Sequence, residues 1–444
     1  MKRRQRKNTA FSLNHFFETK MWYALLAVPV LFIFGKCIMI PVLGFQYEIT
    51  LSEIVIALMT IAYLVYLLSS PRKFAKINIT PIGYTLIALF ILNVLSVLWV
   101  NNLDKWIIAI RVLLYQYAIF FLVINFFKTK RQCITALSAL VIPAIVGGVF
   151  VLYIILGIPY GDLLYMNRAF LVTPLGAMSA VVAMIALTIP VTLGLFAIAT
   201  QRWKRITMAV VYIFLVVAVL FAASKAAIIA IACAIACMTL LIRKHFLGII
   251  ALTLSAIVLY AGITYLPTKI FPGTTILVAI RSAEGLLTDQ VAPATGVSLV
   301  ANRFTHVLSD ASTRFRILEL QTAWQIFLES PLIGQGAGNL KVAYDDHTGF
   351  YDGEANNIFV QYTAEFGLVG LALFGYLLYQ LSFLYRNGYF SRRKKNLIMW
   401  ATLSGVLLTV AINSMFEVTI IGLIYGILFW YVIGIFVAYS RVRS

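Results

Sequence analysis

The sequence has few charged residues and very few acidic ones. Only 11% of its 444 residues are charged, and Asp and Glu together number 16. Soluble domains carry about 25% charged residues, because a water-exposed surface needs them. The chain is instead 62% hydrophobic, with a mean hydropathy of +0.95. These values exclude an ordinary soluble domain and indicate a polytopic membrane protein.

Cysteine is also scarce, and no disulfide framework is available. The four cysteines, Cys37, Cys133, Cys233 and Cys237, all lie in or beside apolar segments. Cys233 and Cys237 share one predicted helix face, a spacing that suits a metal, but no His or acidic residue accompanies them. We interpret all four as small packing residues, since free Cys is among the most buried residue types, and we predict no metal site.

Long apolar runs recur along nearly the whole chain. A helix that spans a bilayer needs about 20 mainly apolar residues, because lipid offers no partner for backbone N–H and C=O groups. We therefore predict an all-α polytopic membrane protein with about 12 transmembrane helices. The predicted spans are 21–40, 51–69, 82–99, 106–127, 134–156, 173–199, 206–223, 226–242, 246–265, 363–384, 397–415 and 418–439.

The net charge of +19 follows this pattern of spans. Most of the 35 basic residues fall in every second loop, where Glu18 is the sole acidic residue. Lys and Arg collect in cytoplasmic loops, so the charge indicates topology and not nucleic-acid binding. The predicted organisation is a cytoplasmic N-terminus (1–20), nine helices (21–265), a large extracytoplasmic loop (266–362), three helices (363–439) and a cytoplasmic tail (440–444). The first span is predicted to be an uncleaved anchor.

The large loop contains two local motifs. Apolar residues recur at helical spacing over 314–329, which predicts an amphipathic helix on the membrane face or on the bundle. Ser312 or Thr313 is placed to cap it and Pro331 to end it. The following Gly334-Gln-Gly336-Ala-Gly338 predicts a turn region; it is not a P-loop, because the Gly-Lys-Ser/Thr ending is missing.

Several basic residues are candidates for binding a phosphorylated substrate. Arg314 and Arg316 offer planar forks that match phosphate oxygens, although lipid headgroups are an equal alternative. Two residues apart on a helix, they diverge by about 200°. Arg111 lies within a predicted span, where a charge is costly and indicates function. Two further cations complete a positive rim at the outer helix ends, with two acidic residues as counter-charges: Arg168 and Lys225, with Glu365 and Glu417.

The loop also carries a longer combination of motifs. Arg316 precedes Pro331-Leu-Ile-Gly334-Gln-Gly336-Ala-Gly338-Asn339, and Asn356-Asn357-Ile-Phe-Val-Gln361 then leads to Glu365-Phe-Gly-Leu-Val-Gly. Over 314–371 this strongly resembles the bacterial O-antigen ligase and O-antigen polymerase superfamily. The resemblance implies a metal-independent glycosyltransferase of the inner membrane, without a cofactor, in surface polysaccharide synthesis. The implied partners are a polyprenyl-diphosphate-linked glycan donor, a glycan or lipid acceptor, membrane lipids and other glycan-assembly membrane proteins, but no nucleic acid.

The resemblance also implies roles for individual residues. The family's donor-binding loop arginine falls on Arg316, and its Ser-Arg pair falls on Ser224-Lys225. The family's His-Asn pair reads Asn356-Asn357 here, and a neutral Asn cannot act as the general base that the His is supposed to be. Asn356 is then expected to orient the acceptor. The alternative bases are His347, Asp352, Glu354 and Glu365.

The predicted catalytic residues are therefore Arg316, Asn356 and Glu365. The predicted substrate-binding residues are Arg111, Arg168, Lys225, Arg314, Asn339, Asn357 and Gln361. The missing His favours a polymerase of lipid-linked repeat units over a ligase that transfers finished glycan to a lipid or protein. Two alternatives from other classes stay open: a twelve-helix transporter and a non-catalytic scaffold. The transporter is disfavoured because no internal repeat of two six-helix halves is visible.

Overall fold

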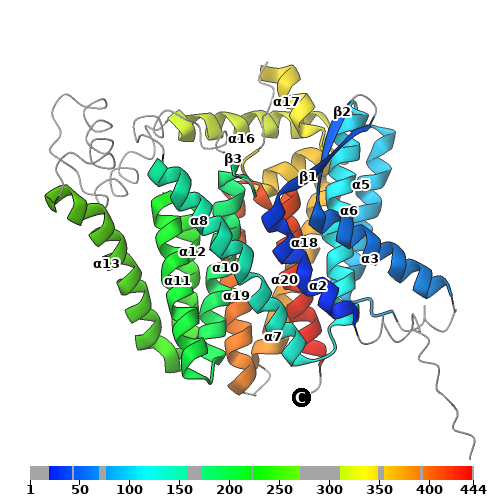
Figure 1. Ribbon diagram of the computed structural model, residues 1–444. Coiled ribbons are helices and arrows are strands. Elements are labelled where there is room, and N and C mark those ends of the chain that lie inside the picture. Colours follow the sequence, from blue (N-terminus) through cyan, green and yellow to red (C-terminus); the bar gives the residue numbers. More distant parts are fainter. Residues whose placement is uncertain are drawn as a thin grey trace, which may run out of the picture.

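The computed structural model describes residues 20–42, 45–69, 77–157, 172–173, 175–222, 224–270, 311–348, 355–390 and 394–442. Helices dominate this part of the chain (Figure 1). Ten of the described helical stretches are long and apolar enough to cross a membrane. Two shorter apolar helices, Met21–Phe34 and Lys225–Leu241, lie at two further predicted spans. The prediction of an all-α polytopic membrane protein is confirmed at this level.

The elements follow one another along the chain as α-helices, short 3-10 helices (η) and two small hairpins. They are α2 (Met21–Leu31), η1 (Phe32–Phe34), β1 (Lys36–Val42), β2 (Phe45–Thr50), α3 (Leu51–Leu68), α5 (Pro81–Leu95), η2 (Ser96–Leu98), α6 (Leu103–Phe126), α7 (Lys130–Ala139), α8 (Val141–Gly157), β3 (Val172–Thr173), β4 (Gly176–Ala177), α10 (Met178–Ile198), α11 (Arg202–Ala222), α12 (Lys225–Leu241), η4 (Arg243–His245), α13 (Phe246–Ile270), α16 (Ala311–Glu329), α17 (Leu340–Thr348), α18 (Ile358–Phe390), α19 (Lys394–Ser414), η5 (Thr419–Ile421) and α20 (Leu423–Arg441).

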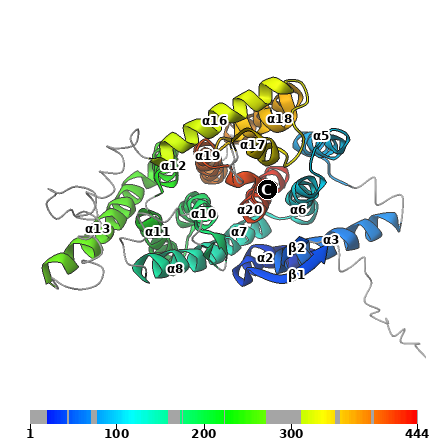
Figure 2. The same cartoon turned by 90° about the horizontal axis from the view of Figure 1, so that it is seen from above.

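The most buried helices are α10 and α20, which the other helices surround (Figure 2). Small residues allow the close approach: a Cβ on Gly194 of α10 would meet Thr402 of α19 at 2.0 Å. A Cβ on Gly434 of α20 would meet Val123 of α6 at 2.9 Å. In lipid there is no hydrophobic drive between helices, so such close backbone packing is what holds a bundle together.

The two ends of the bundle differ in charge. One end carries α16 and α17 (Figure 1), and we call it the loop end; the opposite end, where α20 finishes at Arg441, we call the basic end. In the described part, acidic residues occur on β2, the first two turns of α3, α6 and α18, the α16 and α17 helices, and the α19–η5 connection. Of these, the residues of α16, α17, the start of α18 and the α19–η5 connection lie at the loop end. The short connections at the basic end carry Lys and Arg instead.

The first predicted span is wrong in its second half. A helix was predicted for 21–40, but the helical turns end at Phe34 because Gly35 adopts φ +62°. β1 then pairs antiparallel with β2 from Lys36–Thr50 to Val42–Phe45. Lys36 therefore begins a strand and does not lie inside a helix. The hairpin leads directly into α3, whose N-terminus has a capping box between Thr50 and Glu53.

The predicted span 134–156 lies largely within Lys130–Ile155, one of the ten long apolar stretches, in which α7 ends at Ala139 and α8 begins at Val141. Pro143 lies in the first turn of α8, and its missing N–H cannot bond to the carbonyl of Ala139, the last residue of α7. The predicted boundaries of the large loop at 266 and 362 stay predictions. α13 continues to Ile270 and α18 begins at Ile358, and residues 271–310 lie outside the described part.

Candidate active site

Helix α16 lies across the loop end of the bundle, over α12, α19 and α18 (Figure 2). The predicted amphipathic helix 314–329 is thus confirmed, although α16 begins earlier, at Ala311, so that Ser312 and Thr313 lie within the helix. Its buried face carries Glu319, Thr322 and Ile326. The opposite face exposes large apolar residues, with Trp324 52% exposed and Leu328 59% exposed. An apolar stripe of this kind suits a helix that lies in a membrane interface.

Three segments that are far apart in the sequence meet at the loop end: α16, residues 356–357 before α18, and residues 415–417 after α19. The Asn356 side-chain amide donates a hydrogen bond to the Glu319 carboxylate. One helical turn away, Arg316 Nη2 lies 3.7 Å from Glu417 Oε1, on the connection after α19. Asn357 Nδ2 donates to the carbonyl of Met415 at 3.4 Å. We call these residues the loop-end cluster: Arg316, Glu319, Asn356, Asn357 and Glu417.

The backbone at the start of α18 is shaped for this cluster. Asn356 has φ +47°, a left-handed conformation that Asn and His tolerate better than most residues do. Asn357 Oδ1 accepts from the N–H of Phe359 at 3.0 Å and of Val360 at 3.3 Å, so it satisfies two N–H groups of the helix start. Asn356 is thereby turned toward α16, while Asn357 anchors the helix.

The glycine-rich turn, residues 331–338, interlocks with a break in α18. Gly367 has φ +60° and ψ −157°, so the helix loses its regular hydrogen bonds around this residue. The carbonyls of Ala364 and Glu365 accept instead from the N–H of Gln335 at 3.0 Å and of Gly336 at 2.7 Å. In return, the N–H of Leu368 and of Val369 donate to the carbonyls of Pro331 and Leu332. The predicted turn is confirmed, and these hydrogen bonds fix it to α18. We call the paired segments, residues 331–338 and 364–369, the glycine lock.

Gly334→Ala is expected to destabilise this lock severely. Gly334 has φ +67°, and an added Cβ would lie 2.3 Å from the backbone carbon of Glu365. Left-handed strain and overpacking together should cost about 2 kcal/mol or more of stability. The matched control is Gly375→Ala in the same α18, where an added Cβ meets nothing within 4 Å. The temperature of thermal unfolding in detergent should fall for Gly334→Ala and should stay the same or rise for Gly375→Ala. Equal unfolding temperatures for the two variants would contradict the proposed role of Gly334.

Three predicted site residues lie within this lock and away from the surface of the cluster. Asn339 is 2% exposed, and its Oδ1 accepts from the N–H of Asn102 at 2.8 Å, which ties the turn to the start of α6. Gln361 donates to Glu365 at 2.6 Å and accepts from the N–H of Ala355 at 3.1 Å. Both Gln361 and Glu365 are buried. Their geometry supports a positioning role; their predicted contact with substrate stays a prediction.

Arg111 is held by a carboxylate that the sequence analysis did not consider. Its Nε lies 3.6 Å from Oε1 of Glu53, whose side chain is fully buried in the first turn of α3. A buried ion pair compensates the cost of a charge within an apolar bundle, although the desolvation cost offsets much of the attraction. This pair joins α6 to α3, and it gives Arg111 a structural role in addition to its predicted one.

Two of the three other predicted cations, Lys225 and Arg314, lie in the described part of the chain. Ser224 caps α12 and Lys225 begins it, at the loop end. α12 runs antiparallel to α19, with Met238 against Gly405, so Lys225 and Glu417 lie at the same end of this helix pair. Arg314 lies in the first turn of α16. Arg168 lies outside the described residues.

Among the alternative bases, His347 is engaged elsewhere. Its Nε2 lies 2.7 Å from Glu329 Oε1, and its Nδ1 lies 2.7 Å from the carbonyl of Ala343. These two partners raise the pKa of His347 above its ordinary value, which favours the protonated form and not a base. Asp352 and Glu354 lie outside the described residues. The carboxylate that does meet Asn356 is Glu319, which the sequence analysis missed.

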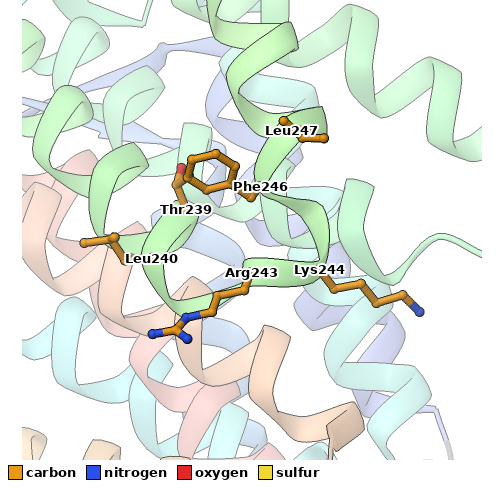
Figure 3. A pocket seen from close by; sticks show the side chains of 6 residues that line it. All are labelled: Thr239, Leu240, Arg243, Lys244, Phe246 and Leu247. Carbon is orange, nitrogen blue, oxygen red and sulfur yellow. The ribbon is translucent and has the colours of Figure 1, made fainter.

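Two surface hollows are found at the basic end, away from the loop-end cluster. One has about 420 Å³ and is formed at the tight connection between α12 and α13, as Figure 3 shows. There Arg243 and Lys244 point in different directions, and Phe246 lies beside Thr239. The other has about 480 Å³ and lies between α5, α18 and α20. Within the described residues, no group of three or more His, Cys, Asp or Glu side chains is arranged to hold a metal ion.

Comparison with known proteins gives one family match. A family model described as O-antigen ligase matches residues 210–375. The matched stretch includes Lys225, Arg316, Glu319, Asn356 and Glu365, and it ends within α18, after the glycine lock. No curated protein sequence matches the chain.

Proposed function

We propose that this chain is a membrane glycosyltransferase of the O-antigen ligase and polymerase superfamily, acting at its loop end. The O-antigen ligase family model that matches residues 210–375 supports this proposal. The protein transfers a glycan from a polyprenyl diphosphate carrier to an acceptor hydroxyl, in the polymerisation of a surface polysaccharide. The observation that carries this proposal is the meeting of a guanidinium, a carboxylate and an amide in the loop-end cluster: Arg316, Glu319 and Asn356.

The proposed orientation places the loop end outside the cytoplasmic membrane and both termini inside. Ten long apolar helices support a multi-pass membrane protein, and the proposed total of twelve spans adds the two shorter apolar helices, Met21–Phe34 and Lys225–Leu241. The Lys and Arg residues of the basic-end connections support a cytoplasmic position for that end, since positive residues are retained in cytoplasmic loops. The loop-end cluster then meets lipid-linked glycans on the outer leaflet.

Arg316 is proposed to bind the donor diphosphate. Negative charge builds on the departing polyprenyl diphosphate, and a guanidinium that is already in place stabilises it in the transition state. Glu417 holds Arg316 at 3.7 Å and so limits its rotation before the substrate binds. Because this cation supplies the positive charge, we propose that the reaction is metal-independent. Lys225 and Arg314 add positive charge at the same end, and Arg111 and Arg168 complete the proposed substrate-binding set with Asn339, Asn357 and Gln361.

Glu319 is proposed to take the role of the missing histidine. The acceptor oxygen forms a bond to the anomeric carbon, the bond from that carbon to the diphosphate oxygen breaks, and the diphosphate leaves with the electron pair. The acceptor proton passes to the Glu319 carboxylate, which, unlike the Asn356 amide, can accept it. Asn356 holds this carboxylate by donating a hydrogen bond to it. Glu365, the base considered from sequence, lies at the glycine lock beside Gln361 and is the second candidate.

The decisive experiment uses purified protein with polyprenyl-diphosphate-linked repeat units, with the products resolved by length. A polymerase should give a ladder of products, and it should do so in the presence of a chelator. One transfer per added lipid or protein acceptor would instead assign a ligase. Uptake of substrate by vesicles without any change in glycan length would favour a transporter and overturn the proposal. If neither glycan transfer nor substrate uptake is detected, the result would favour a non-catalytic scaffold.

Asn356→His is expected to keep or increase transfer and to change its pH dependence. A His at this position adds a base with an ordinary pKa of about 6.5 beside Glu319, and His tolerates the left-handed backbone of Asn356. Product formation is measured from pH 5 to 8. A new inflection near the His pKa would place residue 356 at the reacting hydroxyl. Rates that match the wild type at every pH would remove residue 356 from the site.

A further inference from the structure

The larger hollow at the basic end combines positive charge with an apolar wall. Its volume is about 480 Å³. Lys130 and Arg441 are among its lining residues, and Ile82, Phe383 and Val437 contribute apolar surface. No carboxylate is among the described residues that line it. A hollow whose lining combines two cations with apolar side chains matches a lipid, with a phosphate headgroup and acyl chains.

The two cations are held in place by neighbours that carry no charge. Arg441 Nη2 donates to Asn78 Oδ1 at 2.8 Å, and Asn78 is itself fixed, since its N–H donates to Asn125 Oδ1 at 2.9 Å. Lys130 Nζ lies 5.4 Å from the centre of the Tyr439 ring. These contacts orient both side chains but do not neutralise their positive charge. The two cations can therefore bind an anion.

A buried polar group is also directed at the hollow. Gln380 lines it and is 7% exposed. Its Oε1 accepts from Thr85 Oγ1 at 3.0 Å, while its amide N–H groups have no partner within the described part of the chain. The amide of Gln380 can donate a hydrogen bond to a ligand oxygen in the hollow.

The neighbouring Lys128 indicates the same excess of positive charge. It lies two residues before Lys130 in the connection between α6 and α7. Burial and the like charge of Arg441 lower the pKa of Lys128. A bound anion would relieve this repulsion.

We propose that this hollow binds an anionic phospholipid of the leaflet at the basic end, with the phosphate between Lys130 and Arg441 and an acyl chain along Ile82 and Phe383. Basic pockets between transmembrane helices on the cytoplasmic side are suited to anionic headgroups. Residues of α5, α7, α18, α19 and α20 line the hollow, so the lipid links α18, the helix that follows Asn356, to the rest of the bundle. The proposal does not depend on glycosyl transfer at the loop end.

The test is retention of lipid by the purified full-length protein, measured by native mass spectrometry with phosphatidylglycerol and, separately, with phosphatidylcholine. We expect one phosphatidylglycerol to be retained. Lys130→Gln with Arg441→Gln should weaken retention about thirtyfold, from the loss of two headgroup contacts. The matched control is Arg243→Gln with Lys244→Gln, which removes the same charge at the same end beside the other hollow (Figure 3) and should leave retention unchanged.

Four outcomes would overturn the proposal. Equal weakening by both double substitutions would show unspecific attraction to the basic end. Equal retention of phosphatidylcholine would show that the charge has no part in it. Displacement by inorganic phosphate at the same concentration would assign a free-anion site, and preferential displacement by a polyprenyl phosphate would assign the carrier lipid. Thermal unfolding of each variant in detergent separates loss of the site from loss of the fold.

Discussion

Replacing Arg316 by Ala is expected to reduce glycan transfer by about 10²–10³-fold, the usual cost of removing one group that stabilises transition-state charge. The protein should still insert and fold, because Arg316 is partly exposed and its ion pair with Glu417 is 3.7 Å long. Such a pair contributes about 0–1 kcal/mol to stability. The measurement is the rate of product formation by purified protein, with thermal unfolding as the check on the fold.

Two further substitutions distinguish charge from geometry. Arg316→Lys keeps the charge but loses the planar fork, so an intermediate rate is expected. Glu417→Gln frees the Arg316 side chain and should lower the rate less than Arg316→Ala does. Arg243→Ala, which removes an exposed arginine at the basic end, is the matched control and should leave transfer unchanged. Full product length and rate in Arg316→Ala would refute the donor role of Arg316.

The position of the site could be predicted from sequence because its parts are local. The helical spacing over 314–329 predicts the helix that carries Arg316, and Gly334, Gly336 and Gly338 predict the turn that follows. The structure shows why three glycines are needed: all have positive φ. An added Cβ on Gly336 would lie 2.3 Å from a side-chain methyl of Val100. Close contact with distant segments, and not turn formation alone, sets this requirement.

The partner of Asn356 could not be predicted in the same way. Glu319 and Asn356 are 37 residues apart, and their contact depends on how α16 lies over the start of α18. Periodicity predicts which residues share a helix face, but not which neighbour that face meets. A helical wheel does place Glu319 on the same side as Thr322, Ala323 and Ile326, and a lone carboxylate in such a face is a usable signal. Glu53, the partner of Arg111, was missed for the same reason.

The β1–β2 hairpin shows a different limit. Apart from Lys36, residues 36–42 are apolar, and they follow a helix, so they were predicted to continue it. A short apolar run is ambiguous between strand and helix, and Gly35 and Gly44 on either side were the available signal for a strand. The hairpin matters to the bundle because it leads into the Thr50–Glu53 capping box, and Glu53 then reaches Arg111.

Glu319→Gln is expected to lower transfer by about 10²–10⁴-fold, the range for loss of a general base. The substitution keeps the shape of the side chain and an oxygen that can accept the hydrogen bond from Asn356, so the fold should be retained. Donor binding should also be retained, because Arg316 is unchanged; KM for the donor should stay near the wild-type value while kcat falls. The matched control is Glu329→Gln on the same α16, which removes the partner of His347 and should leave transfer unchanged.

The double variant Glu319→Gln with Asn356→His is the sharpest test of the assignment, because it returns an imidazole to the place of the missing base. If Glu319 performs the proton transfer, the second substitution should restore part of the lost rate, with a pH dependence set by the His. If Glu319 only positions Asn356, the second substitution should restore nothing. A wild-type rate in Glu319→Gln, together with a large loss in Glu365→Gln, would instead assign the proton to Glu365. Since Glu365 lies at the glycine lock, that variant must be shown to unfold at the wild-type temperature before its loss is attributed to chemistry.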